Sequence, residues 1–490
     1  MLSICIILAL AACLLVFKYA RYPGLSTLSE SIQADKERRI PLLLQHRLEI
    51  MSVREKRPVT TFVIRQMGLD NIFTCDHANV QAILATKFKD FELGAGRRHT
   101  LYPMFGVGIF TSDGETWSRS RALLRPQFTR DQISDLELEE HHVQQAMLAM
   151  PVDPATGWTA NTNIQAIIFR LTIDSATEFL FGESAGSQAE ALRNGGTLPP
   201  DHFSGDFDRG QWYVAQRSRY EKFHWLVDNR ESRAVVQRVH EYVDKFVHAA
   251  LGPAGQEKKS DTYVFLEALA TTTKDPIELR SQLLNILLAG RDTTASLLSW
   301  TILMLARHPA IFTKLRAIIL ADFGPYTSRE SISFTSLKSC RYLQYFLAEV
   351  LRLCPAVPIN RRVATTPTTL PVGGGPKGKE PIYLRAGQVV TYSPFITHRR
   401  TDLWGDDVEV FNPDRWVERK VGWEYLPFNG GPRVCIGQQF ALTEAGYVLV
   451  RLLQRFDGLV DCFPQRDIRF GLTLTLAPGD EVVVRLHEAE

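Results

Sequence analysis

One cysteine lies in a stretch whose neighbours suit metal binding. Residues 427–440 read PFNGGPRVCIGQQF, so Cys435 follows a Gly-Gly-Pro run and precedes a glycine by two residues. The apolar spacing of residues 438–450 is that of a helix, which places Cys435 in a tight loop that opens into this helix. Backbone N–H groups at a helix start favour negative charge. Because a thiolate binds metals, the sequence predicts a metal ligand at Cys435.

The residues around this thiol suit a large, flat cofactor. Gly431 and Gly437 have no side chain and allow close approach, and Phe428 is placed to shield the sulfur from water. Arg433 is a fixed cation suited to a carboxylate. A haem offers an iron for the sulfur, a flat ring and propionates for the arginine, and thiolate ligation of haem favours O–O cleavage. The alternative is a buried structural cysteine in a Gly-Pro loop.

A second candidate site interrupts the longest helical pattern of the chain, at about residues 276–308. Its middle carries Gly290, which weakens a helix, followed by the charged residues Arg291 and Asp292 and then Thr293. Buried charges are costly unless they have a partner or a role. A local opening beside a carboxylate and a hydroxyl would hold dioxygen and water. An Asp–Arg pair that closes a helix contact explains the same residues equally well.

Two further pairs fall on predicted helices. Trp117 and Arg121 share one helix face, so an indole N–H and a guanidinium could grip carboxylates there. A surface arginine on an amphipathic helix is the usual alternative. Glu349 and Arg352 are i, i+3 neighbours, and exposed pairs of this kind contribute only ~0–1 kcal/mol. By themselves these two residues indicate no more than a surface ion pair.

Composition and charge exclude several classes of protein. The chain has 490 residues, of which 45% are hydrophobic and 22% charged, as in an ordinary globular protein. Its formal net charge of +2 offers no electrostatic case for binding nucleic acid. The seven cysteines are scattered and form no C-x-x-C pair, which argues against a disulfide framework or a zinc site and for a reducing compartment.

The N-terminus carries an uncharged apolar stretch over residues 2–17, followed by Lys18 and Arg21. A spanning helix needs ~17–25 apolar residues, so this stretch is at the short end. A cleaved signal peptide would carry its cations on the N-terminal side. Here they follow the stretch and favour a cytosolic location for the rest of the chain. We expect residues 1–21 to anchor the protein in a thin bilayer such as the endoplasmic reticulum.

The remaining pattern predicts a mainly α fold with a minor β-rich part. Residues 131–250 look mostly helical, and stretches near residues 381–392 suggest a small sheet. Residues 471–476 and 481–484 alternate in polarity, which predicts a terminal hairpin.

Taken together, these features resemble the cytochromes P-450. Phe428, Gly431, Arg433, Cys435 and Gly437 match the F-x-x-G-x-R-x-C-x-G haem loop of that family at all five positions. The resemblance covers essentially the whole chain. It implies that Cys435 is the axial ligand of a haem b iron and that the fold is a triangular helical prism.

Two more motifs of the family occur in the expected order. Trp117 and Arg121 match a W-x-x-x-R pair, for which the resemblance implies contacts to the haem propionates. Asp292 and Thr293 lie in an A-G-x-D-T-T run that matches the acid–alcohol pair of the monooxygenases. The resemblance implies that this pair relays protons.

A third motif is structural. Glu349 and Arg352 match the E-x-x-R pair of the family, and Arg415 matches the third member of a buried network with them. Such a satisfied network serves structure rather than turnover. The resemblance also implies one domain over residues 22–490, after the anchor of residues 1–21.

Pocket residues follow from position only, with plain core packing as the alternative for each. The candidates are Leu288, Ala289, Val357, Ile359 and Leu472.

The implied function is insertion of one oxygen atom from O₂ into a C–H bond of a hydrophobic substrate. Electrons would come from NADPH through a separate NADPH–cytochrome P-450 reductase, with cytochrome b5 as a further partner. Residues 108–114, 360–364 and 428–433 are similar to the fungal alkane and fatty-acid hydroxylase branch. The expected substrate is therefore a long-chain alkane or fatty acid, or a specialised fungal metabolite.

Two other functions remain open. A haem-thiolate isomerase or dehydratase would rearrange a peroxide without O₂ or reductase. Such enzymes commonly lack the acid–alcohol pair, and Asp292 and Thr293 count against this function. A haem-binding sensor or carrier would consume no NADPH or O₂ with the reductase present.

Overall fold

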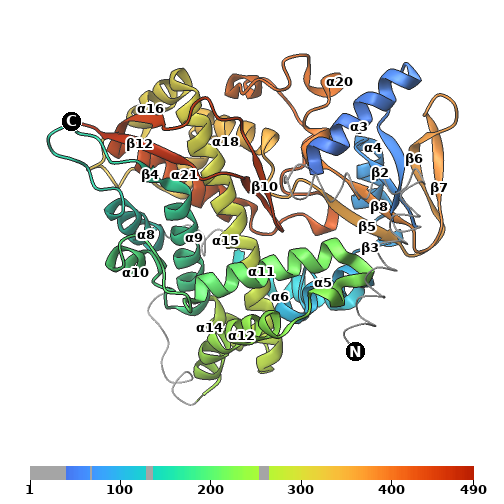
Figure 1. Cartoon of the computed structure of the whole chain (residues 1–490), viewed down its shortest axis with the longest axis horizontal. Helices are drawn as coiled ribbons and strands as arrows, with labels where there is room; N and C mark the ends of the chain where they lie inside the picture. The colour runs from blue at the N-terminus through green and yellow to red at the C-terminus, as the bar shows by residue number, and fades with distance from the viewer. Residues whose placement is uncertain (1–39, 67–68, 129–135, 253–263) are drawn as a thin grey trace, which may run out of the picture. The chain divides into compact units, whose positions relative to one another are not determined.

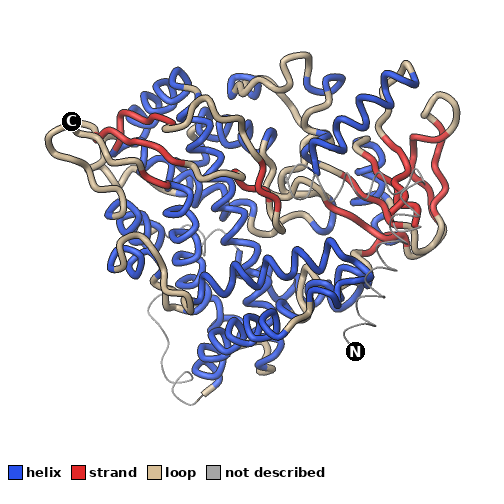
Figure 2. Tube along the Cα trace, viewed as in Figure 1, coloured by secondary structure: helices blue, strands red, loops and turns tan. Residues whose placement is uncertain are grey.

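The structure is a computed structural model that describes residues 40–66, 69–128, 136–252 and 264–490. The expected membrane anchor of residues 1–21 lies outside the described residues. The fold is mostly helical with several small sheets, as the sequence predicts (Figure 2).

The chain divides into two compact units. One comprises the described residues up to 91 together with residues 359–397, and the other comprises the described residues of 92–358 and residues 398–490. β3 (Phe91–Glu92) spans the sequence boundary between the units.

The first unit is built around a small mixed sheet (Figure 1). The strands of this unit are β1 (Thr61–Gln66), β2 (Leu69–Thr74), β5 (Asn360–Ala364), β6 (Thr368–Gly374), β7 (Glu380–Leu384) and β8 (Val389–Tyr392). β2 pairs antiparallel with β1 and parallel with β8, and β8 pairs antiparallel with β5. β6 and β7 form a separate hairpin. Its helical segments are α3 (Ile40–Glu55), α4 (His77–Gln81), η1 (Ala82–Thr86), η2 (Phe88–Asp90) and α19 (Pro394–Thr397).

The second unit is mainly helical. Its longer helices are α5 (Ala95–Phe105), α6 (Gly114–Leu124), α8 (Glu137–Leu148), α9 (Ile164–Phe181), α11 (Phe203–Tyr220), α12 (Arg230–Leu251), α15 (Pro276–Arg307), α16 (Pro309–Phe323), α18 (Arg341–Leu353) and α21 (Gln438–Arg455). Its shorter helical segments are η3 (Arg125–Phe128), α10 (Ser187–Arg193), η4 (Glu221–Val227), α14 (Phe265–Ala270), α17 (Phe334–Ser339), α20 (Thr401–Trp404), η5 (Pro413–Trp416) and η6 (Gly431–Arg433). Most of the predicted helical range 131–250 is therefore helical.

The long helix α15 organises this unit. Its start is set by Asp275, whose side chain accepts a hydrogen bond from the Ile277 N–H at 2.9 Å, and by Pro276 at the first helical position. Most of its side chains are buried, because apolar residues occur on every face. Its first half packs into a core cluster with α5, α11, α12 and α14, and its second half into another with α9, α16, α18 and α21.

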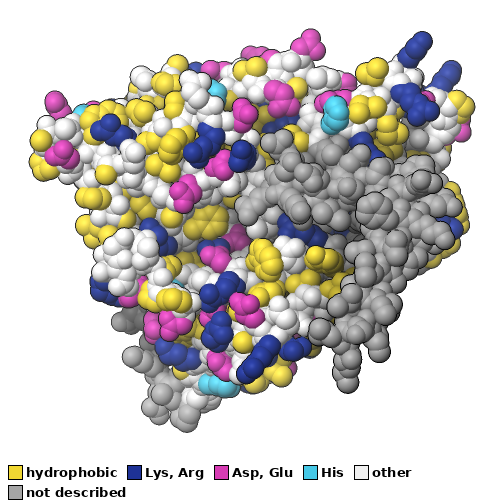
Figure 3. All heavy atoms as spheres, viewed as in Figure 1, with side chains coloured by type: hydrophobic (Ala, Val, Ile, Leu, Met, Phe, Trp, Pro, Cys, Tyr) yellow, Lys and Arg dark blue, Asp and Glu magenta, His cyan; other side chains and the backbone are white. Residues whose placement is uncertain are grey.

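No single helix among the described residues has the length and apolar composition of a membrane span. Only α15 and α16 taken together reach these values, and the two helices are bent by 113° at their junction. On the face shown in Figure 3, acidic and basic side chains are interspersed among hydrophobic ones, in keeping with the small net charge.

The C-terminal strands differ from the predicted hairpin. β10 (Phe470–Leu472) pairs with β11 (Leu476–Pro478) across a three-residue connection. β12 (Val483–Glu488) instead joins β9 (Phe456–Asp461) and β4 (Thr162–Asn163). The alternating pattern correctly indicated strands. It could not indicate the partners, because the apolar face of β12 is buried against residues more than 20 positions away.

Candidate active site

Cys435 lies in the connection between η6 and α21, as the sequence predicts. The chain turns tightly before it, with positive φ angles of 63° at Asn429 and 66° at Gly431. The Cys435 N–H then donates to the Phe428 carbonyl oxygen at 3.0 Å, and Gly437 is the N-cap of α21. The loop is thus held by its own backbone, and its sulfur is placed at a helix start.

The Cys435 thiol lies in a crowded but solvent-accessible position. Protein surrounds it on nearly every side, yet the residue is accessible to solvent. Burial raises the pKa of this thiol, and the backbone of Gly437 and the charge of Arg121 offset the rise only in part. The predicted stabilisation of a thiolate by the helix start is therefore outweighed by desolvation. A metal that bonds the sulfur displaces the proton, so the loop suits a metal-bound cysteine rather than a free thiolate.

Arg433, Trp117 and Arg121 meet beside this loop. The Arg433 guanidinium carbon lies 4.3 Å from the centre of the Trp117 ring, and that of Arg121 lies 6.0 Å from the same ring. Burial lowers the pKa of Arg121. The structure therefore brings Arg433, which is distant in sequence, beside the Trp117 and Arg121 pair of α6.

Asp113 is a member of this group that the sequence analysis missed. Its carboxylate accepts a hydrogen bond from Arg433 Nη2 at 2.7 Å and from the N–H groups of Leu93 and Gly94 at 2.9 and 3.1 Å. In the sequence, Asp113 stands before Gly114 and indicates only a turn. Because the Asp113 carboxylate partly neutralises Arg433, Arg121 is the less neutralised of the two cations.

The middle of α15 presents one accessible stripe. Ala289, Gly290 and Thr293 are partly accessible, whereas their neighbours in the helix are buried. The spacing i, i+1, i+4 places the three on one face. A Cβ built on Gly290 would meet no atom within 4 Å. This stripe is therefore the part of the buried middle of α15 that solvent or a ligand can reach.

Thr293 and Asp292 differ in their surroundings. The Thr293 hydroxyl donates to the Ala289 carbonyl oxygen at 2.6 Å, which leaves its oxygen free to accept a hydrogen bond. Asp292 is buried and lies 2.5 Å from Arg291 Nη1. The same nitrogen lies 2.6 Å from Asp208, which is 54% exposed on α11. Burial raises the pKa of Asp292, and Arg291 offsets part of this rise. Both alternatives for these residues therefore have structural support: the Asp–Arg pair exists, and Thr293 belongs to the accessible stripe.

The loop of Cys435 and α15 belong to one packed region. Ile436, the residue after the cysteine, packs against the core cluster that contains Leu287 and Leu288 of α15. The two parts of the predicted site are therefore supported by the same core.

The E-x-x-R pair is buried and fully engaged. Arg352 donates to both carboxylate oxygens of Glu349, at 2.8 and 2.9 Å, and both side chains are 0% exposed. Arg415 Nε lies 3.4 Å from Glu349, and Trp416 Nε1 donates to it at 3.0 Å. The structure therefore brings the three predicted residues together and excludes the exposed surface pair. The sequence analysis missed Trp416, whose indole was not distinguished from ordinary core.

The predicted pocket residues are dispersed. Ala289 belongs to the accessible stripe of α15, whereas Leu288 is buried in the core cluster. Leu472 lies in β10, and its carbonyl oxygen accepts a hydrogen bond from Arg219 Nη2 at 2.7 Å. Val357 is 38% exposed, and Ile359 belongs to the first unit. Ala289 is therefore the pocket candidate with the most direct structural support.

The residues fit a haem: an accessible cysteine at a helix start, two guanidinium groups beside an indole, and an accessible helix stripe in the same packed region. The sequence profile of the cytochrome P-450 family matches residues 41–479. This chain belongs to the cytochrome P-450 family.

Curated relatives of this cytochrome P-450 come from fungi. Cytochrome P-450 monooxygenase g430 of Fusarium sp. is 48% identical over 473 residues, which cover 94% of this chain and 81% of that protein. Cytochrome P-450 52A13 of Debaryomyces hansenii is 48% identical over 411 residues, or 81% and 78% of the two chains. Cytochrome P-450 52A6 of Candida tropicalis is 43% identical over 488 residues, or 96% and 90%.

Membership of the cytochrome P-450 family defines the general reaction of this protein. The protein is a cytochrome P-450 monooxygenase, an oxidoreductase that incorporates oxygen from O₂ into a hydrophobic substrate. Its cofactors are haem iron and, through a reductase, NADPH.

Proposed function

We propose that this cytochrome P-450 is a membrane-anchored hydroxylase of an unactivated C–H bond in a long-chain alkane or fatty acid, or in a specialised fungal metabolite. The observation that carries the proposal is the accessible stripe of Ala289, Gly290 and Thr293 in a helix that is otherwise buried. Such a stripe offers an apolar wall with one hydroxyl, which suits a hydrophobic substrate next to a proton-handling group. The similarity of residues 108–114, 360–364 and 428–433 to alkane and fatty-acid hydroxylases supports the substrate class.

Cys435 would hold the haem through its sulfur, Gly431 and Gly437 would allow the ring to approach the loop, and Phe428 would shield the sulfur from water. The bound haem supplies the activation of O₂, to which a thiolate ligand contributes electron density. The role of this part of the chain is to place the sulfur and to keep water from it.

Trp117, Arg121 and Arg433 would bind the two propionates. Arg121 carries the less neutralised charge, since Asp113 is bonded to Arg433. We assign Arg121 the direct charge contact, and Trp117 the role of donating its indole N–H and stacking against Arg433.

Asp292 and Thr293 would handle protons. Burial raises the pKa of Asp292, so this carboxyl exchanges protons closer to neutral pH than an ordinary aspartate. The Thr293 oxygen keeps an acceptor site because its proton is directed to Ala289. A proton at Asp292 would pass through water to a water molecule held at the Thr293 oxygen.

The proposed setting is the endoplasmic reticulum. Residues 1–21 would form the anchor and residues 22–490 one catalytic domain in the cytosol, where reductase and cytochrome b5 are reached. The uncharged stretch of residues 2–17 and the cations Lys18 and Arg21 support this orientation.

The first test is a pair of spectra. In the reduced protein, carbon monoxide should give the red-shifted band of thiolate-bound haem, and titration of the ferric protein with dodecanoic acid should shift its spin state from low to high. A thiolate band without any shift would contradict the fatty-acid substrate and leave the specialised metabolite. A haem-containing, folded protein without the band would overturn the role of Cys435.

A further inference from the structure

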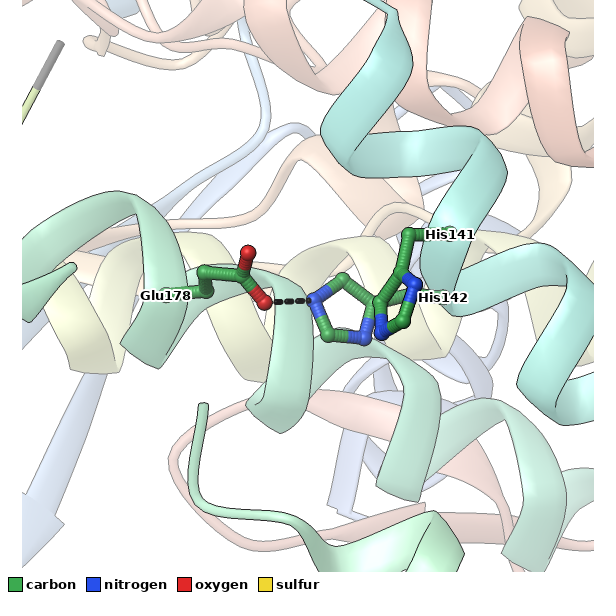
Figure 4. Close-up of side chains that lie close together, drawn as sticks. All are labelled: His141, His142 and Glu178. Atoms are coloured by element: carbon green, nitrogen blue, oxygen red, sulfur yellow. Dashed lines mark ion pairs between the residues drawn. The ribbon is translucent and has the colours of Figure 1, made fainter. Parts of the chain in front are cut away.

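A group of histidine and glutamate side chains on α8 and α9 has no part in the mechanism above. In Figure 4 the His142 ring lies between Glu178 and His141, and His142 Nε2 is 2.8 Å from a Glu178 oxygen. The three side chains therefore do not converge on one centre, as the ligands of a metal ion do. This group is a carboxylate–imidazole pair, and a ligand site is found elsewhere in the second unit.

A cavity of about 680 Å³ lies between α5, α6, α12 and the first turns of α15. These elements belong to the second unit and meet in the lower part of Figure 1. The volume is within the range of small-molecule sites. None of the residues of the candidate active site is among those that line the cavity. The cavity is therefore a second space, distinct from that site.

The cavity and the accessible stripe lie along the same face of α15. Gln282, which lines the cavity, precedes Ala289 of the stripe by seven residues, which is nearly two turns or about 10 Å. Asn285 lies between the two. Asn285 Nδ2 donates to the Phe105 carbonyl oxygen at 2.8 Å, and Asn285 Oδ1 accepts from the Phe110 N–H at 3.2 Å. A hydrogen-bonded side chain thus separates the cavity from the stripe.

The open end of the cavity is apolar. Tyr102, Val107 and Ile277 line it, and they are 51%, 42% and 60% exposed. A single exposed apolar side chain is ordinary, but several around one opening mark a surface that another apolar group covers. This end of the cavity therefore suits a hydrocarbon chain.

The inner wall is polar and uncharged. Ser120 and Gln282 line it and are 3% and 1% exposed. Gln282 Nε2 donates to the Ser120 hydroxyl oxygen at 2.9 Å. Among the described residues, Gln282 Oε1 has no hydrogen-bond partner, and the Ser120 hydroxyl proton has no acceptor. One acceptor and one donor side by side suit a hydroxyl group, which can both donate and accept.

The two guanidinium groups of the lining are already neutralised. Arg119 Nη2 lies 3.0 Å from a Glu278 oxygen. Arg280 Nη1 lies 2.6 Å from an oxygen of Asp244 on α12. His240 adds no charge at neutral pH, because burial lowers its pKa. The lining therefore holds no cation that would attract a carboxylate.

The remaining charge in the lining is negative. Glu115 and Asp275 line the cavity and form no ion pair within the described part of the chain. Their charge repels an anionic head group. A cationic head group would lose its water at an inner wall of uncharged groups, which is costly. An uncharged head group fits both parts of the lining.

We propose that this cavity is a second binding site, which takes an uncharged long-chain alcohol. The hydroxyl group would bond to Gln282 and Ser120, and the chain would extend past Ile277 to the open end. This inference rests on the proposed function, because hydroxylation of an alkane yields such an alcohol. The site would hold this product about 10 Å along α15 from the place where it forms.

Photolabelling of the full-length, haem-loaded protein tests the site. After irradiation with a dodecanol that carries a diazirine in its chain, labelled peptides should contain residues 102–107 and 277–284. An excess of 1-dodecanol should prevent this labelling. Imidazole, which occupies the haem iron, should not prevent it. Label confined to other peptides, or loss of the label with imidazole, would overturn the proposal.

Competitors with the same chain test the head group. At pH 8, where dodecanoic acid is a carboxylate, it should protect the cavity from labelling far less than 1-dodecanol does. Glu115→Lys, which reverses one charge of the lining, should increase protection by the acid. Equal protection by acid and alcohol in the wild type, or better protection by dodecylamine, would contradict an uncharged head group.

Two variants test the inner wall and the opening separately. Gln282→Leu should weaken protection by 1-dodecanol roughly two- to tenfold, as loss of one hydrogen bond predicts. Gln188→Leu, at a glutamine of α10 that is 2% exposed and outside the cavity, is the control.

Ile277→Ser changes a side chain that is 60% exposed, so folding is preserved. It should weaken protection roughly threefold, because apolar contact is lost. Val417→Ser, at a position that is 57% exposed and outside the cavity, is its control. Wild-type protection in both Gln282→Leu and Ile277→Ser would contradict the assigned pose.

Failure of this inference is distinguishable from failure of the proposed function. A spin-state shift with dodecanoic acid, without label in the cavity, would overturn the alcohol site alone. Label in the cavity without any spin-state shift would contradict the fatty-acid substrate and not the cavity site.

Discussion

At the scale of single residues, the site depends on a few side chains whose surroundings differ from what their types suggest. Cys435 is accessible although protein surrounds it, and burial raises its thiol pKa. Arg433 is not a free cation, because Asp113 is bonded to it. Each of these properties comes from neighbours that are distant in sequence.

Replacement of the thiol tests the ligand. Cys435→Ala should abolish the red-shifted carbon monoxide band, because no other cysteine of the described residues lies in this loop. Cys462→Ala is the matched control, since Cys462 is partly accessible and lies outside the loop. A variant that keeps the band would show that another group binds the iron.

Removal of the Thr293 hydroxyl tests proton delivery. Thr293→Ala should leave haem bound but divert reducing equivalents from product to hydrogen peroxide, because a water molecule is no longer held at that oxygen. The ratio of product to NADPH consumed measures the effect. Thr301→Ala, a buried threonine two turns further along α15, should keep the wild-type ratio. Equal ratios in the two variants would contradict the relay.

Asp113 gives a prediction that only the structure suggests. Asp113→Asn removes the charge that orients Arg433 and weakens a hydrogen bond between charged groups, worth about 2 kcal/mol. We expect faster loss of haem to an acceptor such as apomyoglobin, by roughly tenfold. The control is Glu115→Gln, which changes an exposed acid in the first turn of α6, the helix that begins directly after Asp113.

At the scale of elements, α15 and α18 have different tasks. α15 is apolar on nearly every face and joins two core clusters, and it leaves one accessible stripe. α18 supplies a buried ion pair that ties residues near positions 349, 398 and 408 together through hydrogen bonds from Arg352. α15 carries the accessible stripe of the candidate site, and α18 holds the chain in place at residues 398 and 408.

The buried pair on α18 should be expensive to break. Glu349→Gln leaves the Arg352 charge uncompensated at a position that is 0% exposed, which should cost about 3–5 kcal/mol of stability. Thermal unfolding of the haem-loaded protein measures this loss. Glu183→Gln, which removes an exposed partner of Lys245, should cost less than about 1 kcal/mol. Similar losses in the two variants would show that the pair on α18 is not specially stabilising.

At the scale of the whole molecule, the chain combines an apolar N-terminal stretch with a mainly helical body of near-neutral charge. The body provides the candidate site within its second unit. Deletion of the N-terminal stretch therefore tests whether it controls the location of the protein without changing the chemistry of the site.

Deletion of residues 2–21 should move the protein from the membrane fraction to the soluble fraction. The carbon monoxide band should remain, because the residues of the candidate site begin at Asp113. Fractionation of cell lysates followed by spectroscopy of each fraction measures both properties. Recovery of the shortened chain in the membrane fraction alone would contradict the proposed single anchor.

The sequence by itself determined the chemistry of the site, because the spacing of Cys435, Arg433 and the neighbouring glycines is local and a loop is specified by its own residues. It also indicated the long helix and the helical class, since periodic burial is visible within one segment. Only the tertiary structure decided which residues meet: Asp113 with Arg433, Trp416 with Glu349, Asp208 with Arg291, and β12 with β9 rather than β10. Each of these contacts joins segments that are separated along the chain, so no local pattern in the sequence could indicate it.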